Sequence, residues 1–215
     1  MSQVIAICGT MGSGKTTVLQ QLSRQIPGCV RLEEDDYNPA PLRSLAEVQA
    51  WQERGGQVDE FDLSLLAAEL QARTAVPDNL VLLETQFGRL HATLRPWIDL
   101  QIWIDVDADI AFARKVAQLT RQFLNSPETA SAEESLNWIA GFCESYLQTT
   151  RKLFFRQRTE VGGQCDERIN GSGTPQDVCA RLQAVLAPVL AVEKMNLLCK
   201  PEFHGPSTRP QERTP

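Results

Sequence analysis

The sequence predicts an α/β fold, a three-layer sandwich in which a five-stranded parallel sheet carries helices on both faces. Two observations carry this prediction. Short apolar segments alternate with segments of helical periodicity, which is typical of a parallel sheet. Three of these segments also end in strongly polar residues, at the strand ends where such sheets bind ligands. The predicted strands are Gln3–Cys8, Cys29–Leu32, Leu80–Leu83, Leu100–Val106 and Glu167–Ile169.

Local signals predict where the helices begin and end. Pro27-Gly28 stops the first helix, and Gly55-Gly56 separates two helical patterns. Ser131 and Glu134 have the spacing of a capping box, and Pro175 suits the first position of a helix. The predicted helices are 15–26, two within 43–75, one from Asp107 or Asp109 to about Phe123, 131–158, and a last one from Pro175.

The length and composition suit one globular domain. We expect residues 1–199 of the 215 to form it, and we expect residues 200–215, rich in Pro, Thr, Arg and Glu, to be a disordered tail. A net charge of −6 argues against nucleic acid or an anionic membrane as a partner. The six scattered cysteines lack paired metal-binding spacings, and the chain shows neither a secretory signal nor a membrane span. These features predict free thiols and a cytoplasmic protein.

The segment Gly9–Thr16 (GTMGSGKT) fits the phosphate-binding pattern G-x-x-x-x-G-K-[ST]. Its glycines allow backbone N–H groups to wrap around an anion, and the helix that begins near Lys15 directs its positive dipole end there. An apolar strand precedes the loop and an amphipathic helix follows it, as the motif requires. The sequence therefore predicts a P-loop NTPase fold that binds ATP and Mg²⁺ through Gly9, Thr10, Met11, Gly12, Ser13, Gly14, Lys15, Thr16 and Thr17.

Carboxylates follow two other predicted strands. Asp35 and Asp36 come after the second strand, and Glu84 ends the third. A carboxylate at the end of a buried strand is costly unless it is hydrated or paired, and Mg²⁺ supplies such a partner. Phosphate transfer to a hydroxyl also needs a base near the nucleophile. We expect Asp35, in preference to Asp36, to serve as this base or to hold the metal's water shell; the alternative is a solvated acidic loop that includes Glu33 and Glu34.

Together these motifs resemble the uridine kinase-like branch of P-loop small-molecule kinases, which also includes phosphoribulokinases, nicotinamide riboside kinases and bacterial pantothenate kinases. The resemblance rests on the loop at 9–16, on Glu34-Asp35-Asp36-Tyr37 and on Leu83-Glu84, and it covers roughly residues 3–190. It implies that Asp35 is the catalytic base and that Thr16 and Glu84, with Asp35 near the metal's water shell, organise Mg²⁺.

The resemblance also implies a substrate side, with helices at about 43–76, and a closing lid at about 114–130. Asp36, Tyr37 and Asp59 would contact the substrate. Arg114 would stabilise the charge on the transferring phosphate, with Lys115 or Arg121 as helpers. The segment 171–174 would lie beside the adenine.

Several further side chains have two interpretations. Arg89 and His91 follow the third strand closely and can bind an anionic or polyhydroxy substrate, or they belong to local surface pairs. Trp51, Phe61 and Trp97 can stack on a base or sugar, or they belong to the core.

The chain also departs from the family's pattern. Gln118 and Leu119 stand where relatives usually place Arg and then Asp, Asn38 replaces an aromatic residue, and Gln52 stands where nucleoside-specific relatives often place Asp. These departures bear on the assignment of a nucleoside as the acceptor more than on the assignment of kinase chemistry.

The sequence therefore predicts an ATP-dependent kinase that phosphorylates a hydroxyl of a small molecule, with Lys15, Asp35 and Arg114 as catalytic residues. A nucleoside such as uridine is the leading acceptor, and pantothenate or a sugar phosphate follows. One alternative is a nucleoside monophosphate or dephospho-coenzyme A kinase, because the pockets of such enzymes need several arginines and residues 40–90 contain them. Another alternative is an NTP-binding switch with slow hydrolysis. The sequence is also compatible with a homo-oligomer.

Overall fold

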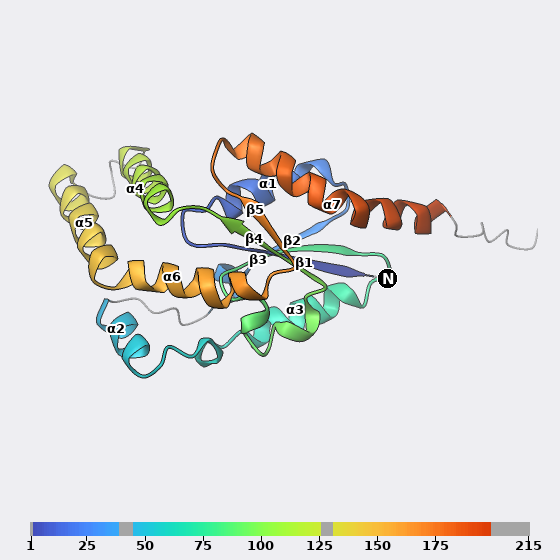
Figure 1. The fold of residues 1–215 in the computed structure, drawn as a ribbon, viewed down its shortest axis with the longest axis horizontal. Helices are drawn as coiled ribbons and strands as arrows, with labels where there is room; N and C mark the ends of the chain where they lie inside the picture. The colour runs from blue at the N-terminus through green and yellow to red at the C-terminus, as the bar shows by residue number, and fades with distance from the viewer. Residues whose placement is uncertain (1, 39–44, 126–130, 199–215) are drawn as a thin grey trace, which may run out of the picture.

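The computed structural model of the protein describes residues 2–38, 45–125 and 131–198. The predicted tail at 200–215 and the end of the predicted lid, residues 126–130, lie outside this part of the chain. Within it, one five-stranded sheet occupies the centre, with helices on either side (Figure 1).

The sheet is parallel throughout, as predicted, and its strand order is β2-β3-β1-β4-β5. In this order β1 lies between β3 and β4, so the chain leaves β1 toward one side of the sheet and later crosses to the other. Such a switch point is where parallel sheets form a ligand crevice at the carboxyl ends of the strands. The strands are β1 (Gln3–Cys8), β2 (Val30–Glu33), β3 (Leu80–Thr85), β4 (Leu100–Asp105) and β5 (Glu167–Asn170).

Seven α-helices surround the sheet in the described ranges. Gly55 and Gly56, with φ angles of 106° and 58°, separate the second helix from the third, and Pro175 opens the last, as predicted. None of the helices in these ranges is both long and apolar enough to cross a bilayer. They are α1 (Lys15–Gln25), α2 (Leu45–Glu53), α3 (Ser64–Thr74), α4 (Ala108–Asn125), α5 (Ala132–Ser145), α6 (Arg151–Glu160) and α7 (Pro175–Leu198).

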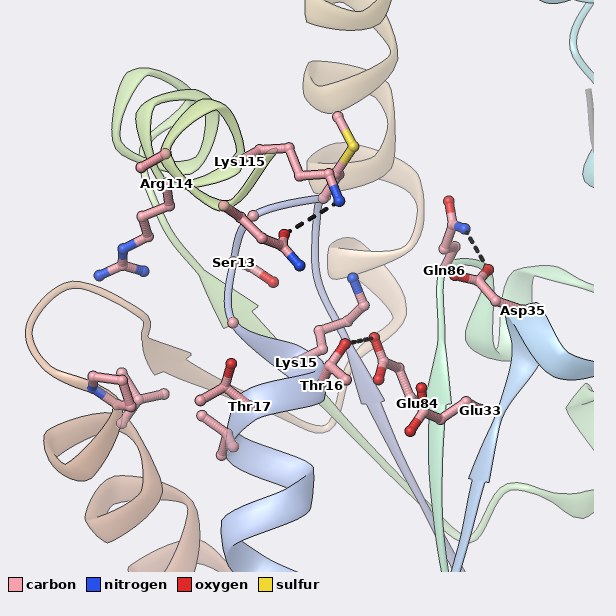
Figure 2. A pocket seen from close by; sticks show the side chains of 18 of the residues that line it. Ser13, Lys15, Thr16, Thr17, Glu33, Asp35, Glu84, Gln86, Arg114 and Lys115 are labelled. Atoms are coloured by element: carbon pink, nitrogen blue, oxygen red, sulfur yellow. Dashed lines mark hydrogen bonds between the residues drawn. The ribbon is translucent and has the colours of Figure 1, made fainter. Parts of the chain in front are cut away.

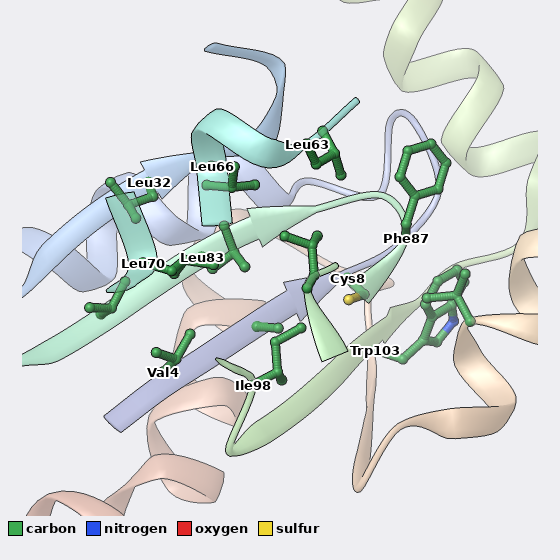
Figure 3. Close-up of a cluster of buried hydrophobic side chains, with 14 residues drawn as sticks. Val4, Cys8, Leu32, Leu63, Leu66, Leu70, Leu83, Phe87, Ile98 and Trp103 are labelled. Atoms are coloured by element: carbon green, nitrogen blue, oxygen red, sulfur yellow. The ribbon is translucent and has the colours of Figure 1, made fainter. Parts of the chain in front are cut away.

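Each face of the sheet has its own apolar core, because successive side chains of a strand point to opposite faces. Ile5 and Ile7 of β1 pack with buried residues of α1 and α7. Val4 and Ala6 face the other way, into a core completed by α3 and by the segments that follow β3 and α6 (Figure 3). Helices on both faces confirm the predicted three-layer sandwich.

The helix predicted from Ser131 to about Arg158 forms in two parts. Ser131 Oγ accepts a hydrogen bond from the Glu134 N–H, and the Glu134 side chain accepts one from the Ser131 N–H, so the capping box is confirmed. A π-helical segment, Tyr146–Thr150, then joins α5 to α6. In Figure 1, α5 stands beside α4, whereas α6 leads back toward the sheet. The π segment thus separates a part that packs on α4 from a part that reaches the sheet's ligand-binding edge.

Candidate active site

The phosphate loop follows β1 directly and depends on two glycines with left-handed backbone angles. Gly12 has a φ of 79°, and Gly14, which caps α1, has a φ of 98°. L side chains rarely adopt such angles. A Cβ atom at Gly12 would also lie only 2.0 Å from the carbonyl oxygen of Ala111. Glycine at this position therefore allows both the curvature of the loop and the close packing of α4 against it.

Lys15 folds back over this loop. Its side chain is buried, and its Nζ donates hydrogen bonds to the carbonyl oxygens of Gly9 at 2.9 Å and Thr10 at 3.2 Å. Ser13 Oγ is also buried, and among the described residues it has no hydrogen-bond partner. Figure 2 shows both side chains on the loop that leads into α1. An anion here would meet a cation, a free hydroxyl and the N-terminus of a helix, which together form a phosphate site.

Thr16 and Glu84 meet beside the loop. Thr16 Oγ1 donates to Glu84 Oε1 at 2.9 Å (Figure 2). Glu84 Oε2 is buried and finds no partner in the part of the chain that the structure describes. Burial raises the pKa of Glu84, although the charge of Lys15 and the Thr16 hydrogen bond lower it. A hydroxyl beside a buried carboxylate oxygen that lacks a partner is a donor set that fits Mg²⁺, because this cation prefers oxygen ligands.

Asp35 lies in a 3-10 turn, Glu34–Tyr37, that directly follows β2. Its carboxylate is exposed, and Oδ1 accepts a hydrogen bond from Gln86 Nε2 at 3.1 Å. Burial is the main cause that raises the pKa of Glu84, and the negative charge of Asp35 adds to this rise. The structure thus places Asp35 close enough to Glu84 for the two carboxylates to interact, and it does not join them in a direct contact.

Glu34 is a site residue that sequence reasoning missed. It is 2% exposed, and its Oε2 accepts hydrogen bonds from Thr85 Oγ1 and from the Gln86 N–H at 3.2 Å. Burial raises its pKa from 4.5 to about 7, and the two hydrogen bonds oppose this rise. The signal was present, since Glu34 continues the inward-facing alternation of Leu32, but the run of four acidic residues concealed it.

The basic residues of α4 do not contribute equally to the site. Lys115 Nζ donates to Gln118 Oε1 at 3.2 Å. Burial, and next the charge of Lys15, lower the pKa of Lys115. Two ammonium groups therefore act on each other across one cavity, an arrangement that a bound polyanion would relieve.

Arg114 lines the cavity beside the P-loop and also contacts a loop further along the chain. Its guanidinium donates to the carbonyl oxygens of Gly171 and Gly173, both at 2.9 Å, and so holds the loop that follows β5. Figure 2 shows Arg114 on the side of that loop and Lys115 above Lys15. Arg114 and Lys115 both line the cavity beside the P-loop, and the Arg114 guanidinium is in addition bonded to the two carbonyl groups.

Two cavities meet at this edge of the sheet. The phosphate cavity, of about 610 Å³, is lined by the P-loop, by Thr16, Thr17 and Glu84, and by basic residues of α4. The acceptor cavity, of about 200 Å³, is lined by aromatic residues and by one side of α6. Glu34, Asp35 and Gln86 line both. The predicted base therefore stands where the two cavities join.

Aromatic rings form much of the wall of the acceptor cavity. Phe61 stacks on Phe87 with ring centroids 4.9 Å apart, and Trp51 meets Phe61 edge-on at 5.5 Å. Arg156 lies over Trp51 at 5.9 Å and donates from Nε to both Glu160 oxygens, at 2.8 and 2.9 Å. Arg156, the cation that lines this cavity among the described residues, is thus paired with a carboxylate, in contrast to the lysines of the phosphate cavity.

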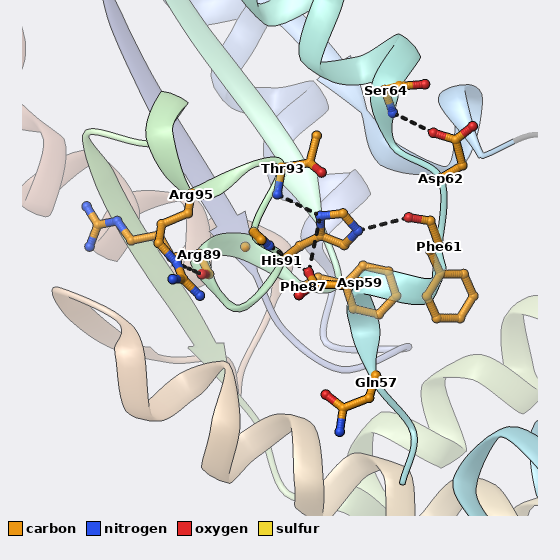
Figure 4. Close-up of polar contacts among 12 residues, drawn as sticks. Gln57, Asp59, Phe61, Asp62, Ser64, Phe87, Arg89, His91, Thr93 and Arg95 are labelled. Carbon is orange, nitrogen blue, oxygen red and sulfur yellow. Dashed lines mark hydrogen bonds and ion pairs between the residues drawn. The ribbon is translucent and has the colours of Figure 1, made fainter. Parts of the chain in front are cut away.

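Two predicted substrate residues, Arg89 and Asp59, contact other parts of the fold. Arg89 donates to Asp166 Oδ1 at 2.8 Å and to the Asp99 carbonyl at 2.7 Å. Asp59 accepts from the Ala92 N–H at 2.7 Å. Neither lines either cavity. Figure 4 shows them in the polar network that holds the segment after β3, where these contacts already satisfy their charged groups.

Three further substrate candidates, Asp36, Tyr37 and His91, also lie outside both cavities. Asp36 is exposed, and Tyr37 packs against the core under α3. His91 is buried; its Nδ1 accepts from the Thr93 N–H, and its Nε2 pairs with the Phe61 carbonyl at 3.0 Å (Figure 4). The imidazole is therefore a structural link behind the acceptor cavity.

A phosphate loop at the end of β1, with a threonine–carboxylate pair beside it, defines a P-loop NTPase. The chain is similar to the uridine kinase of Deinococcus deserti, at 26% identity over 176 residues that cover 69% of this chain and 83% of the relative. It is equally similar to the shikimate kinase of Trichormus variabilis, at 27% identity over 189 residues covering 86% and 91%. A gluconokinase from Sinorhizobium meliloti shares the fold, with a TM-score of 0.53 at 13% identity over 92% of this chain and 98% of its own. No protein-family model matches the chain.

The protein is therefore a P-loop kinase that phosphorylates a hydroxyl group of a small molecule. This confirms the predicted fold class and enzyme class. The two curated relatives differ in name and match equally well, so the similarity defines a kinase and does not select its acceptor.

Proposed function

We propose that this kinase transfers the γ-phosphate of ATP to a hydroxyl group of a nucleoside, with Asp35 as the general base. The observation that carries the proposal is the place of Asp35 at the junction of the two cavities. The hydrogen bond from Gln86 fixes one carboxylate oxygen, and the other can approach the acceptor. As the acceptor oxygen bonds to the γ-phosphorus, its proton passes to Asp35 and the bond to the ADP oxygen breaks.

The phosphate cavity would hold ATP by a division of roles. The loop amides and Lys15 would bind the phosphates, for which Lys15 exchanges its bonds to Gly9 and Thr10 for phosphate oxygens. Thr16 and Glu84 would hold Mg²⁺, which supplies charge neutralisation when bound.

The α4 cations would act at either end of the nucleotide. Lys115, which shares the cavity with Lys15, would stabilise the charge that develops on the transferring group. Arg114 would act indirectly, because it positions the loop at Gly171 and Gly173 that the family resemblance places beside the adenine.

The acceptor cavity supports an uncharged, ring-bearing acceptor. Its aromatic wall suits a flat base. Its charged lining among the described residues is three carboxyl groups and one guanidinium, and that guanidinium is paired with a carboxylate, Arg156 with Glu160. A phosphate or carboxylate on the acceptor would therefore meet net repulsion. This charge pattern favours a nucleoside over a nucleoside monophosphate and over an acid such as shikimate.

The proposal is tested by ADP production from Mg·ATP with a panel of acceptors. Uridine and cytidine represent the proposed class, uridine monophosphate the phosphorylated one, and shikimate and gluconate the acids. We expect a large, saturable rise with a nucleoside, no rise with the anionic acceptors, and loss of the rise in Lys15→Ala. A Lys15-dependent rise with an acid or a monophosphate, and none with any nucleoside, would overturn the proposed acceptor class and leave the kinase chemistry standing.

A further inference from the structure

A third cavity, of about 580 Å³, lies outside the site described so far. We call it the outer cavity. It is formed between the start of α4 and one side of the helical run that α5, the π-helical segment and α6 make, with Asp109 and Phe112 on the first side and Leu147, Arg151 and Phe155 on the second. None of its lining residues lines the phosphate cavity or the acceptor cavity, so it is a separate surface of the molecule.

The outer cavity exposes large apolar side chains to water. Leu147 is 72% exposed and Phe155 is 49% exposed, and both line it. Five of the seven large apolar side chains that are exposed in the described ranges lie on α4, α5, the π-helical segment or α6. Single exposed apolar residues are common on monomeric proteins, whereas a gathering of them on neighbouring elements is typical of an interaction surface.

Two charges of this cavity lack an ion-pair partner within the part of the chain that the structure describes. They are Asp109 on α4 and Arg151 at the start of α6. Arg158, which also lines the cavity, pairs with Asp105 at 2.8 Å and with Asp107 at 3.6 Å. The outer cavity therefore presents one available acid and one available base, and they come from different elements.

Between these two charges lies a buried aromatic side chain, Tyr146. Its ring stacks on Phe112 with centroids 4.0 Å apart, and its hydroxyl donates to the Ala108 carbonyl at 3.3 Å. Burial raises the pKa of Tyr146, the charge of Arg151 lowers it, and the charge of Asp109 adds to the rise. Both charges thus act on the same ring, and the cavity has an acidic side and a basic side above an aromatic floor.

A surface of this kind is complementary to a copy of itself. In a two-fold symmetric contact, a residue of one copy that meets a second residue of the other copy does so twice, with the roles exchanged. Such a contact can place each Arg151 opposite Asp109 of the other copy, while Leu147 and Phe155 lose their contact with water. A partner whose surface carries one sign of charge would match one side of the cavity and oppose the other, whereas a second copy matches both.

We propose that the outer cavity is the contact surface of a two-fold symmetric dimer of this chain, in which Leu147, Arg151 and Phe155 of each copy enter the outer cavity of the other and Arg151 pairs with Asp109 across the contact. The proposal is independent of the acceptor and of the kinase chemistry, because the outer cavity shares no lining residue with the phosphate and acceptor cavities.

Sedimentation velocity of the full chain, over a range of micromolar concentrations, tests the proposal. The wild type should sediment as a dimer. Arg151→Asp and Asp109→Arg each place two like-charged pairs in the contact, so each should raise the Kd of the dimer by about 10- to 100-fold. Lys152→Asp is the matched control, because Lys152 is an exposed neighbour of Arg151 that does not line the outer cavity, and it should keep the wild-type Kd.

Mixing the two charge-reversed proteins distinguishes a self-complementary contact from a general loss of structure. In a heterodimer of Arg151→Asp with Asp109→Arg, the introduced acid faces the introduced base, and the two unchanged residues face each other. The mixture should therefore form a heterodimer with a Kd close to that of the wild type, which native mass spectrometry identifies by mass. A misfolded variant would not be rescued in this way.

Leu147→Ser is a second variant that changes no charge, and it should also raise the Kd because it removes an exposed apolar side chain from the centre of the contact; it serves if a charge reversal disturbs folding, as judged by circular dichroism. A wild type that stays monomeric over the whole concentration range overturns the proposal. A dimer that survives both charge reversals, or a mixture of the two folded variants that stays monomeric, overturns it as well, because the contact then lies elsewhere or does not pair Arg151 with Asp109.

Discussion

The phosphate cavity and the acceptor cavity share the wall at Asp35 but are assembled in different ways. One continuous segment, residues 11–18, forms a large part of the wall of the phosphate cavity. The acceptor cavity is built from side chains of segments far apart in the sequence, such as Trp51 of α2, Phe87 after β3 and Gln157 of α6. Phosphate binding is therefore a local property of this chain, and acceptor recognition depends on the whole fold.

The two cavities also treat charge differently. Lys15 and Lys115 form their hydrogen bonds with neutral groups, so their charges are available to a polyanion. Arg156 is held by Glu160, and the acceptor cavity has further carboxyl groups in its wall. We therefore expect one end to attract phosphate and the other to repel it, a difference in charge that would help to orient ATP and the acceptor.

The largest effect is expected where the cavities join. Asp35→Asn keeps the size of the side chain and removes the base, so kcat should fall by roughly 10²- to 10⁴-fold while ATP affinity stays close to that of the wild type. Steady-state kinetics and ATP titration measure the two quantities. Asp36→Asn is the matched control, because Asp36 lies outside both cavities and should tolerate the same change. Equal losses in the two variants would contradict the assignment of the base to Asp35.

Glu34, which belongs to both cavities, should make stability depend on pH. Its pKa rises from 4.5 to about 7 on folding because the carboxyl group is buried. Between these values the folded protein holds a proton that the unfolded chain releases, so the free energy of unfolding falls as pH rises through this window, by an amount on the order of 3 kcal/mol. Denaturant unfolding of the wild type and of Glu34→Gln, at pH values across the window, measures the loss.

The glutamine variant cannot titrate at this position, so its free energy of unfolding, relative to that of the wild type, should increase as the pH rises from 4.5 to about 7. Glu33→Gln is the matched control, since Glu33 lies half-buried in an ion pair with Arg31. If the wild type and Glu34→Gln lose stability in parallel across the window, Glu34 is not the group responsible.

The metal-binding pair should give the next largest effect. Glu84→Gln replaces the buried carboxylate beside Thr16 with a neutral amide, and we expect the Mg²⁺ concentration for half-maximal activity to rise by about 10- to 100-fold. Activity against Mg²⁺ concentration measures this at saturating ATP. The same titration on Asp35→Asn separates the two roles predicted for Asp35: an unchanged Mg²⁺ requirement supports the base, and a raised one assigns Asp35 to the metal. An unchanged requirement in Glu84→Gln would remove Glu84 from the metal site.

The contrast between the cavities explains what the sequence could predict. The phosphate loop is a contiguous motif, the strands follow from alternating apolar runs, and Ser131, Glu134 and Pro175 mark helix ends through contacts within a few residues. These are local signals, and the structure confirms the fold elements that they predicted. The parallel sheet then brings Glu84 beside Thr16, because Glu84 lies near the end of β3 and Thr16 follows the neighbouring strand β1.

The contacts that sequence reasoning did not foresee depend on distant partners. Arg89 looked available for substrate, yet it is bound by Asp166, which lies 77 positions further along the chain. Arg114 looked like a lid cation, yet its acceptors are the carbonyls of Gly171 and Gly173. Nor could a sequence pattern show that Gln157 borders the acceptor cavity, because its place depends on how the chain returns to the sheet.

The smallest effect tests the repulsive charge of the acceptor cavity. Glu160→Gln removes the carboxylate that pairs with Arg156, so the guanidinium becomes available to an anion. An exposed ion pair is worth up to about 1 kcal/mol, and we therefore expect uridine monophosphate to inhibit the variant about fivefold more tightly than the wild type, with the KM for uridine little changed. Glu144→Gln, an exposed residue of α5, is the matched control. Equal inhibition of all three proteins would mean that the Arg156 pairing does not exclude anions, and the selection against phosphorylated acceptors would then rest on the carboxyl groups at the junction.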